Sequence, residues 1–115
     1  IERAAAGRDA PQLLAVLRAY LCGDDAVARA QVARHAPRRI LQVSEGTGEP
    51  TERRRVPGVA ALEPRAGRVF GLEVRAVSRS RVAVQWQADE ACVQGVDLAH
   101  RAAGWTFVRV GSACD

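Results

Sequence analysis

The chain has 115 residues, a hydrophobic share of 48% and a formal net charge of +4. A chain of this length fits one domain and can bury a single core without a metal ion or several disulfides. No apolar run approaches the roughly 18 residues that a membrane helix needs. We therefore expect a lead-in or linker at 1–8 and a single domain at 9–115 that does not insert into a membrane.

The residue usage is biased, because the chain contains no Met, Lys or Asn although it has 17 basic residues. Those three residue types have AT-rich codons, so their absence predicts a high-GC bacterium as the source. The missing initiator Met suggests that a signal peptide or membrane anchor preceded Ile1, or that the piece was trimmed. The arginines are mostly scattered and aromatics are few, so we do not expect a nucleic-acid partner.

Two helices are predicted near the start of the chain. Asp9 can cap a helix whose apolar residues recur with helical spacing over 13–21, and Gly23 is expected to end it in a left-handed conformation. Asp24 or Asp25 can cap a second, mostly alanine helix over 26–36, which Pro37 stops. We expect a short strand at 40–43, a mobile loop at 44–55 and irregular chain or a short edge strand at 56–68.

Alternating apolar residues then predict two hairpins that form one four-stranded antiparallel meander. The first hairpin spans 70–88 and turns at 78–80. The second turns at 102–104, with Gly104 in the left-handed position of a three-residue loop. The expected pairs are Phe70–Ala88, Leu72–Trp86, Val74–Val84, Ala76–Val82, Val82–Leu98, Val84–Val96, Val96–Val110, Leu98–Val108 and Asp97–Arg109. The expected fold class is α+β, with one or two N-terminal helices on a curved four-stranded sheet.

The same register sets Cys92 opposite Cys114, close enough for a disulfide. A bridge there would indicate an oxidising compartment, and we expect a periplasmic or secreted protein. Two alternatives remain open, namely a bridge from Cys22 to one of the other two cysteines, or three reduced thiols. The spacing of the cysteines and of His35 and His100 does not match a metal site, so neither a metal nor another cofactor is expected.

The best candidate for a binding surface is the second face of the sheet, around Trp105, Phe107 and Arg109. This apolar group is either exposed to a partner or covered by the 40–68 segment. The run Arg53, Arg54 and Arg55 in the predicted loop is an electrostatic accessory to this surface or a solvated loop. His35, Asp24 and Asp25 are explained by helix capping, and no catalytic residue is assigned.

The order of two helices, an irregular segment and a four-stranded meander resembles the NTF2-like (cystatin-like) superfamily. The resemblance implies a curved sheet wrapped around the first helix, in a group that ranges from isomerases and dehydratases to non-catalytic interaction modules. We expect a non-enzymatic extracytoplasmic domain that binds another protein, as a secretion-system component, inhibitor or immunity protein does. The alternative is a small NTF2-like isomerase, dehydratase or hydrolase that uses His100 or Tyr20 in a pocket between helix and sheet.

Overall fold

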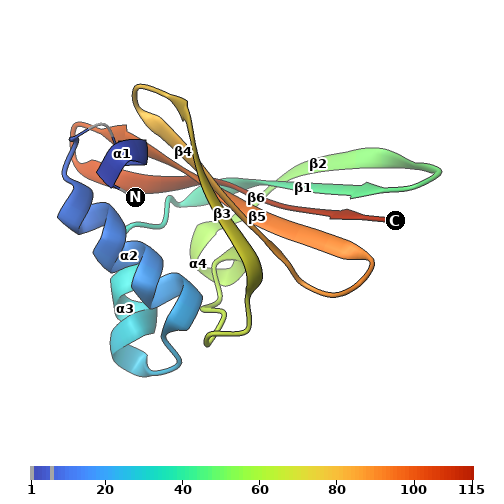
Figure 1. Cartoon of the computed structure of the whole chain (residues 1–115), viewed down its shortest axis with the longest axis horizontal. Coiled ribbons are helices and arrows are strands. Elements are labelled where there is room, and N and C mark those ends of the chain that lie inside the picture. Colours follow the sequence, from blue (N-terminus) through green and yellow to red (C-terminus); the bar gives the residue numbers. More distant parts are fainter. Residues whose placement is uncertain (1, 6) are drawn as a thin grey trace.

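The computed structural model describes residues 2–5 and 7–115 (Figure 1). The helices and strands, in chain order, are α1 (Glu2–Ala5), α2 (Ala10–Cys22), α3 (Ala26–Arg34), β1 (Arg39–Gly46), β2 (Glu49–Pro57), α4 (Gly58–Ala61), β3 (Phe70–Ser78), β4 (Arg81–Gln87), β5 (Cys92–Arg101) and β6 (Gly104–Cys114).

The strands form one twisted sheet in the order β2-β1-β6-β5-β4-β3. Neighbouring strands are antiparallel except β1 and β6, which run parallel. The predicted four-stranded antiparallel sheet is therefore wrong, because the described residues form six strands and the sheet is mixed. The helices α2 and α3 lie on one side of it, and the β1–β2 hairpin extends away from them (Figure 1).

The two additional strands come from the segment in which we expected a short strand and a mobile loop. Residues 44–55 instead continue β1 and form β2, in which every side chain except the half-buried Val56 is exposed. A strand at the sheet edge needs neither an apolar face nor full backbone pairing, so it can contain charged residues and proline. Both Pro50 and Pro57 lie in this edge strand.

The helix predictions are largely confirmed. The carboxylate of Asp9 accepts a hydrogen bond from the Gln12 amide at the start of α2, and that of Asp25 accepts one from the Ala28 amide in α3. The left-handed conformation expected at Gly23 is wrong, because its φ is −73°. Glycine is needed there for space, since a Cβ atom at this position would lie 2.2 Å from Cβ of Ala28.

Most of the expected strand register is confirmed, including the pairs Val74–Val84, Ala76–Val82, Val82–Leu98, Val84–Val96, Val96–Val110 and Asp97–Arg109. The pairs at the start of β3 are wrong. An irregularity around Gly71, whose φ is +62°, pairs Phe70 with Gln87 and leaves Leu72 without its expected partner Trp86. Phe70 is 70% exposed as a result.

The pair Leu98–Val108 is also wrong, because Leu98 lies opposite Phe107. The register shifts directly after the Asp97–Arg109 pair, so Val108 is an additional residue in β6 and forms a β-bulge. A shift of one residue moves side chains to the other face of a strand. The predicted outward positions of Trp105 and Phe107 are therefore wrong, and both side chains are buried in the core.

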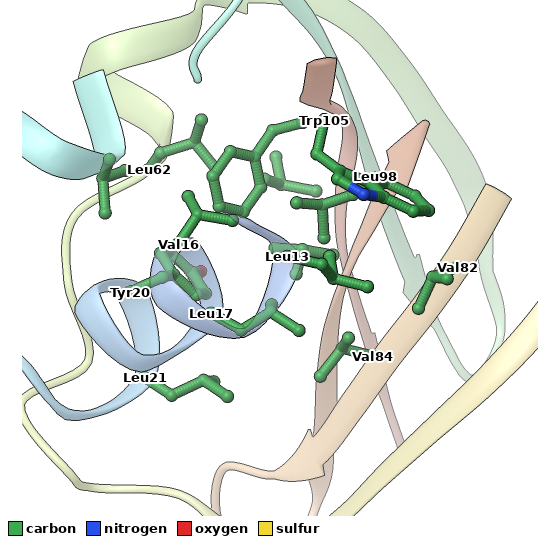
Figure 2. Close-up of a cluster of buried hydrophobic side chains, with 14 of the residues drawn as sticks. Leu13, Val16, Leu17, Tyr20, Leu21, Leu62, Val82, Val84, Leu98 and Trp105 are labelled. Carbon is green, nitrogen blue, oxygen red and sulfur yellow. The ribbon is translucent and has the colours of Figure 1, made fainter. Parts of the chain in front are cut away.

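The core lies between α2 and the inner face of the sheet (Figure 2). Leu13, Val16 and Leu17 of α2 are fully buried there because their helical spacing places them on one side of the helix. Tyr20, one turn further on, packs edge-on against Trp86 and at a tilt against Phe107. Ala5 of α1, within the predicted lead-in, is also buried in this core.

The predicted disulfide between Cys92 and Cys114 is confirmed. The bridge joins the first residue of β5 to the last residue of β6, and the third cysteine, Cys22, is free and exposed. A bridge from Cys22 and a fully reduced chain are thus both ruled out in this structure.

Replacing both bridged cysteines by serine should lower the free energy of unfolding by about 3 kcal/mol, because the bridge closes a loop across a sequence separation of 22. Urea denaturation followed by circular dichroism measures the change. Cys22→Ser is the matched control and should stay within about 0.5 kcal/mol of the parent, because this side chain is exposed. Equal effects of both changes would contradict a stabilising bridge.

Trp105→Ala should lower the free energy of unfolding by about 3–5 kcal/mol, because it removes a large side chain that is 1% exposed. Phe70→Ala provides a control of similar chemistry at an exposed position and should change stability by less than about 0.5 kcal/mol. A Trp105→Ala protein as stable as its parent would show that the ring lies outside the core.

Candidate functional site

The outer face of the sheet, opposite the helices, retains part of the predicted binding surface. Across the sheet, Arg55 of β2 pairs with Leu41 of β1, Leu41 with Arg109 of β6, and Arg109 with Asp97 of β5. Directly paired residues point to the same face of a sheet. Arg55 and Arg109 are therefore on one face, and Arg53, two residues before Arg55, shares it.

Arg54 lies on the opposite face, where its Nε donates a hydrogen bond to Oε1 of Gln42 over 3.2 Å. The three consecutive arginines were predicted to act together from a loop. The strand conformation separates them, because successive side chains of a strand point to opposite faces. Two of the three, Arg53 and Arg55, thus remain candidates for the outer surface.

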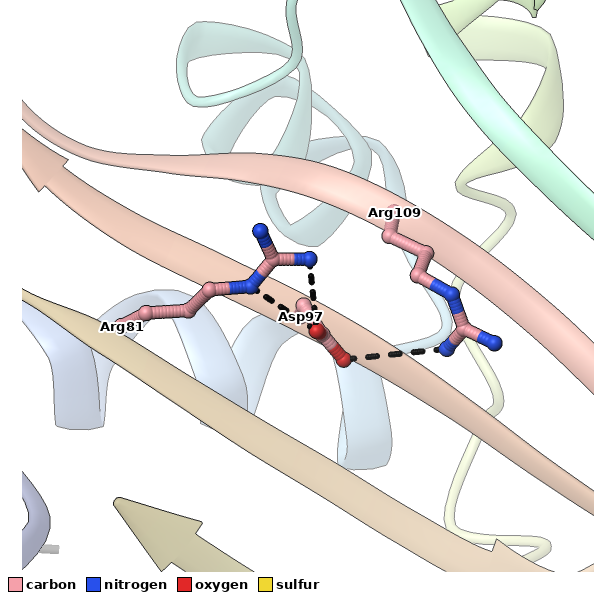
Figure 3. Close-up of polar contacts among 3 residues, drawn as sticks. All are labelled: Arg81, Asp97 and Arg109. Carbon is pink, nitrogen blue, oxygen red and sulfur yellow. Dashed lines mark hydrogen bonds and ion pairs between the residues drawn. The ribbon is translucent and has the colours of Figure 1, made fainter. Parts of the chain in front are cut away.

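Asp97 is the central acidic residue of this face (Figure 3). Its Oδ2 accepts hydrogen bonds from Nε and Nη2 of Arg81 at 3.0 and 2.8 Å, and its Oδ1 lies 3.9 Å from Nη1 of Arg109. One carboxylate therefore interacts with two guanidinium groups, and the three side chains together keep a net positive charge. Among the side chains that the structure describes, the ion pairs are confined to this group.

A hollow of about 370 Å³ lies beside this group on the same face, and we call it the arginine hollow. Its lining residues are Pro37, Arg39, Leu41, Arg55, Arg81, Arg101, Thr106, Phe107 and Val108. Four of them are arginines and none is acidic. Three of the arginines, Arg39, Arg55 and Arg101, are exposed, so their charge is available to a partner.

A second cavity of about 200 Å³ lies between α2 and the inner face of the sheet, and we call it the polar cavity. It occupies the place that the enzyme alternative predicted for a pocket. Its sheet side is a row of paired residues that runs from Trp86 to Gln94, Ser112 and Ser44. The neighbouring row deeper in the core is mostly apolar, namely Val84, Val96, Val110 and Gln42.

The segment between α4 and β3 closes the other side of the polar cavity. It is tied to the end of α2 because the Arg65 amide donates to the Tyr20 carbonyl over 2.6 Å and the Gly67 amide donates to the Leu21 carbonyl over 2.7 Å. These bonds place Arg65 beside the cavity. Its Nη2 donates to Oε1 of Gln94 over 2.9 Å, and its Cζ lies 5.9 Å from the ring centroid of Trp86.

Tyr20 also lines the polar cavity and is 3% exposed. Burial raises the pKa of its phenol to about 12, although the neighbouring Arg65 guanidinium acts in the opposite direction. The phenol is therefore protonated at neutral pH and is not a base there.

The two histidines lie apart from the polar cavity. His35 caps the C-terminus of α3, and its Nδ1 lies 2.8 Å from the Trp105 carbonyl, so it connects α3 to β6. His100 packs edge-on against the Trp105 ring with centroids 5.2 Å apart. Of the two residues named for the enzyme alternative, Tyr20 lines the cavity and His100 does not. The described residues contain no group of His, Cys, Asp or Glu arranged to bind a metal ion.

Some of these residues could have been identified from the sequence. Gln94 and Ser112 fall on inward positions of β5 and β6, between Val96 and Cys92 and between Val110 and Cys114. Polar residues in a row of core positions are a signal for an internal polar site. Arg65 and Arg101 offered no such signal, because each lies outside the alternating core pattern.

Neither the protein-family models nor the curated proteins include a match to this sequence. In addition, none of the described helices is long and apolar enough to cross a membrane.

The tyrosine absorbance change should have its midpoint near pH 12 in the folded protein, because burial raises the pKa of Tyr20, the only tyrosine in the chain. In the unfolded chain the midpoint should be near pH 10. Since the folded state then binds more protons between pH 10 and 12, the free energy of unfolding should fall across this range by roughly 2–3 kcal/mol.

Ultraviolet titration of a Cys22→Ser protein, which lacks the free thiol, measures the midpoint with and without urea. Tyr20→Phe in the same background should remove the tyrosine part of the fall in stability. A folded-state midpoint near pH 10 would show that the phenol is solvated.

Proposed function

We propose that this domain is a non-enzymatic extracytoplasmic binding domain that docks an acidic surface of another protein on the outer face of its sheet. The observation that supports this most directly is the arginine hollow, which gathers Arg39, Arg55, Arg81 and Arg101 without an acidic residue among its lining. Complementary charge favours encounter with an acidic partner and disfavours a basic one.

The surface favours a protein over a nucleic acid. Proteins that bind single strands stack bases on exposed aromatic rings, whereas Phe107, the aromatic residue that lines the arginine hollow, is buried in the core. Arg81 is held by two hydrogen bonds to Asp97, and Arg109 lies within ion-pair distance of it, so the carboxylate lowers the net charge of the face. Arginine is also enriched at protein–protein interfaces relative to the rest of the surface.

The disulfide supports the extracytoplasmic part of the proposal, because such bridges persist in oxidising compartments. The resemblance to the NTF2-like superfamily, with its non-catalytic interaction modules, is part of the same proposal. The proposal also includes the class of protein, namely a secretion-system component, inhibitor or immunity protein of a high-GC bacterium.

The test is a charge-reversal pair. Arg55→Glu with Arg101→Glu should weaken the binding of a fluorescein-labelled peptide of alternating Glu and Ser by about tenfold or more, because two exposed arginines of the hollow are lost. Fluorescence anisotropy at two salt concentrations measures the dissociation constant.

The matched control is Arg18→Glu with Arg29→Glu, which makes the same change in net charge on the exposed sides of α2 and α3. It should leave peptide binding within about twofold of the parent. An equal loss in both pairs would show attraction by net charge alone. Tighter binding of a single-stranded DNA of the same charge would contradict a protein partner.

A further inference from the structure

The polar cavity has an excess of hydrogen-bond donors and one full positive charge. Nε of Arg65 and Nε1 of Trp86 are buried and lack a hydrogen-bond partner among the described residues. The lining also includes the phenol of Tyr20, the amide of Gln42 and the hydroxyls of Ser44 and Ser112, but no Asp or Glu.

Leaving a buried donor unpaired destabilises the folded state, and an unpaired charged donor does so more strongly. Native proteins contain few such groups, and their presence calls for an explanation. Both unpaired nitrogens belong to residues that line one cavity, and Trp86 is only 2% exposed. Their common location indicates a ligand that accepts hydrogen bonds.

The neighbours of Arg65 hold its guanidinium group in place. Gln94 accepts a hydrogen bond from Nη2, and the backbone bonds from Arg65 and Gly67 to the carbonyls of α2 fix the segment that holds the side chain. A preorganised arginine loses little conformational freedom on binding, and its planar group matches a carboxylate.

We propose that the polar cavity binds a small organic carboxylate, with the Arg65 guanidinium as its charged anchor. The volume of about 200 Å³ is below the roughly 300–1,000 Å³ of sites for drug-sized molecules, so the ligand is small. Val110 of the apolar row and the ring of Trp86 contact its body. Oε1 of Gln42 accepts from Arg54, which leaves the Gln42 amide group free to donate. This site lies on the face of the sheet opposite the arginine hollow and is independent of it.

The test uses sodium benzoate as the probe and the indole N–H signals of the two tryptophans in a proton–nitrogen correlation spectrum. Benzoate should shift the Trp86 signal in a saturable way. Trp105 is an internal reference, because its Nε1 already donates to the Arg8 carbonyl over 2.7 Å and it does not line the cavity. Benzamide, which has the same shape without the charge, should bind at least about tenfold more weakly.

Arg65→Met should weaken benzoate binding by about tenfold or more, whereas Arg68→Met, an exposed arginine in the same segment, should leave it unchanged. The benzamide comparison is made on the parent protein and does not depend on the folding of a variant. Acetyl-alanyl-alanine with a free carboxylate distinguishes the two possible sources of the bound carboxylate. If this peptide binds more tightly than benzoate, the site is assigned to a peptide C-terminus. If it binds more weakly, the site is assigned to a free acid.

The following results would each overturn the proposal. They are the absence of a saturable Trp86 shift with benzoate and with the peptide, equal binding of benzamide, and unchanged binding in Arg65→Met. Inorganic phosphate that binds as tightly as benzoate would also overturn it, because the cavity would then be a general anion site.

Discussion

The β-bulge at Val108 is the constraint on which the rest of the structure depends. By shifting the alternation of β6, it turns Phe107 and Trp105 inward, where they fill the space between the sheet and the helices. Trp105 then connects β6 to three other segments. Its amide donates to Gln12 of α2, its indole donates to the Arg8 carbonyl, and its own carbonyl lies within 2.8 Å of His35 at the end of α3. Without the extra residue, these rings would face solvent and the helices would lose their main contacts with β6.

The inner face of the sheet is apolar at one end and polar at the other. Close to Phe107 the paired residues Leu98 and Val82 are apolar, and further along the strands they become Gln94, Ser112 and Ser44 before the Cys92–Cys114 bridge. The helix α2 covers the apolar end, and Tyr20 lies where the change occurs. Such a gradient gives up hydrophobic stabilisation at one end of the core and leaves a polar cavity in its place. The disulfide offsets part of that loss at the same end of the sheet.

The two faces of the sheet offer different chemistry to a partner. The outer face is open, with arginines whose charge is only partly balanced by Asp97, and suits a broad acidic surface. The inner site is small, and its donors and Arg65 are held by packing and hydrogen bonds. Protein binding on one face and a small anion on the other can therefore coexist, because the sheet separates the two sites.

The sequence by itself determined α2 and α3 with their aspartate caps, most of the register of β3 to β6, and through that register the disulfide. These features depend on local periodicity and on pairing between strands that follow one another in the chain. The spacing of apolar residues along the sequence indicates both directly. Only the tertiary structure decided that β1 joins β6 in parallel, that 49–57 is a strand, and that Val108 bulges. Edge and parallel pairings are long-range and need no local apolar pattern, and a bulge inverts the faces while leaving the composition of the strand unchanged. The strand pairing likewise decided that Arg53 and Arg55 share a face with Arg109 while Arg54 lies on the other, and that Trp105 and Phe107 point inward.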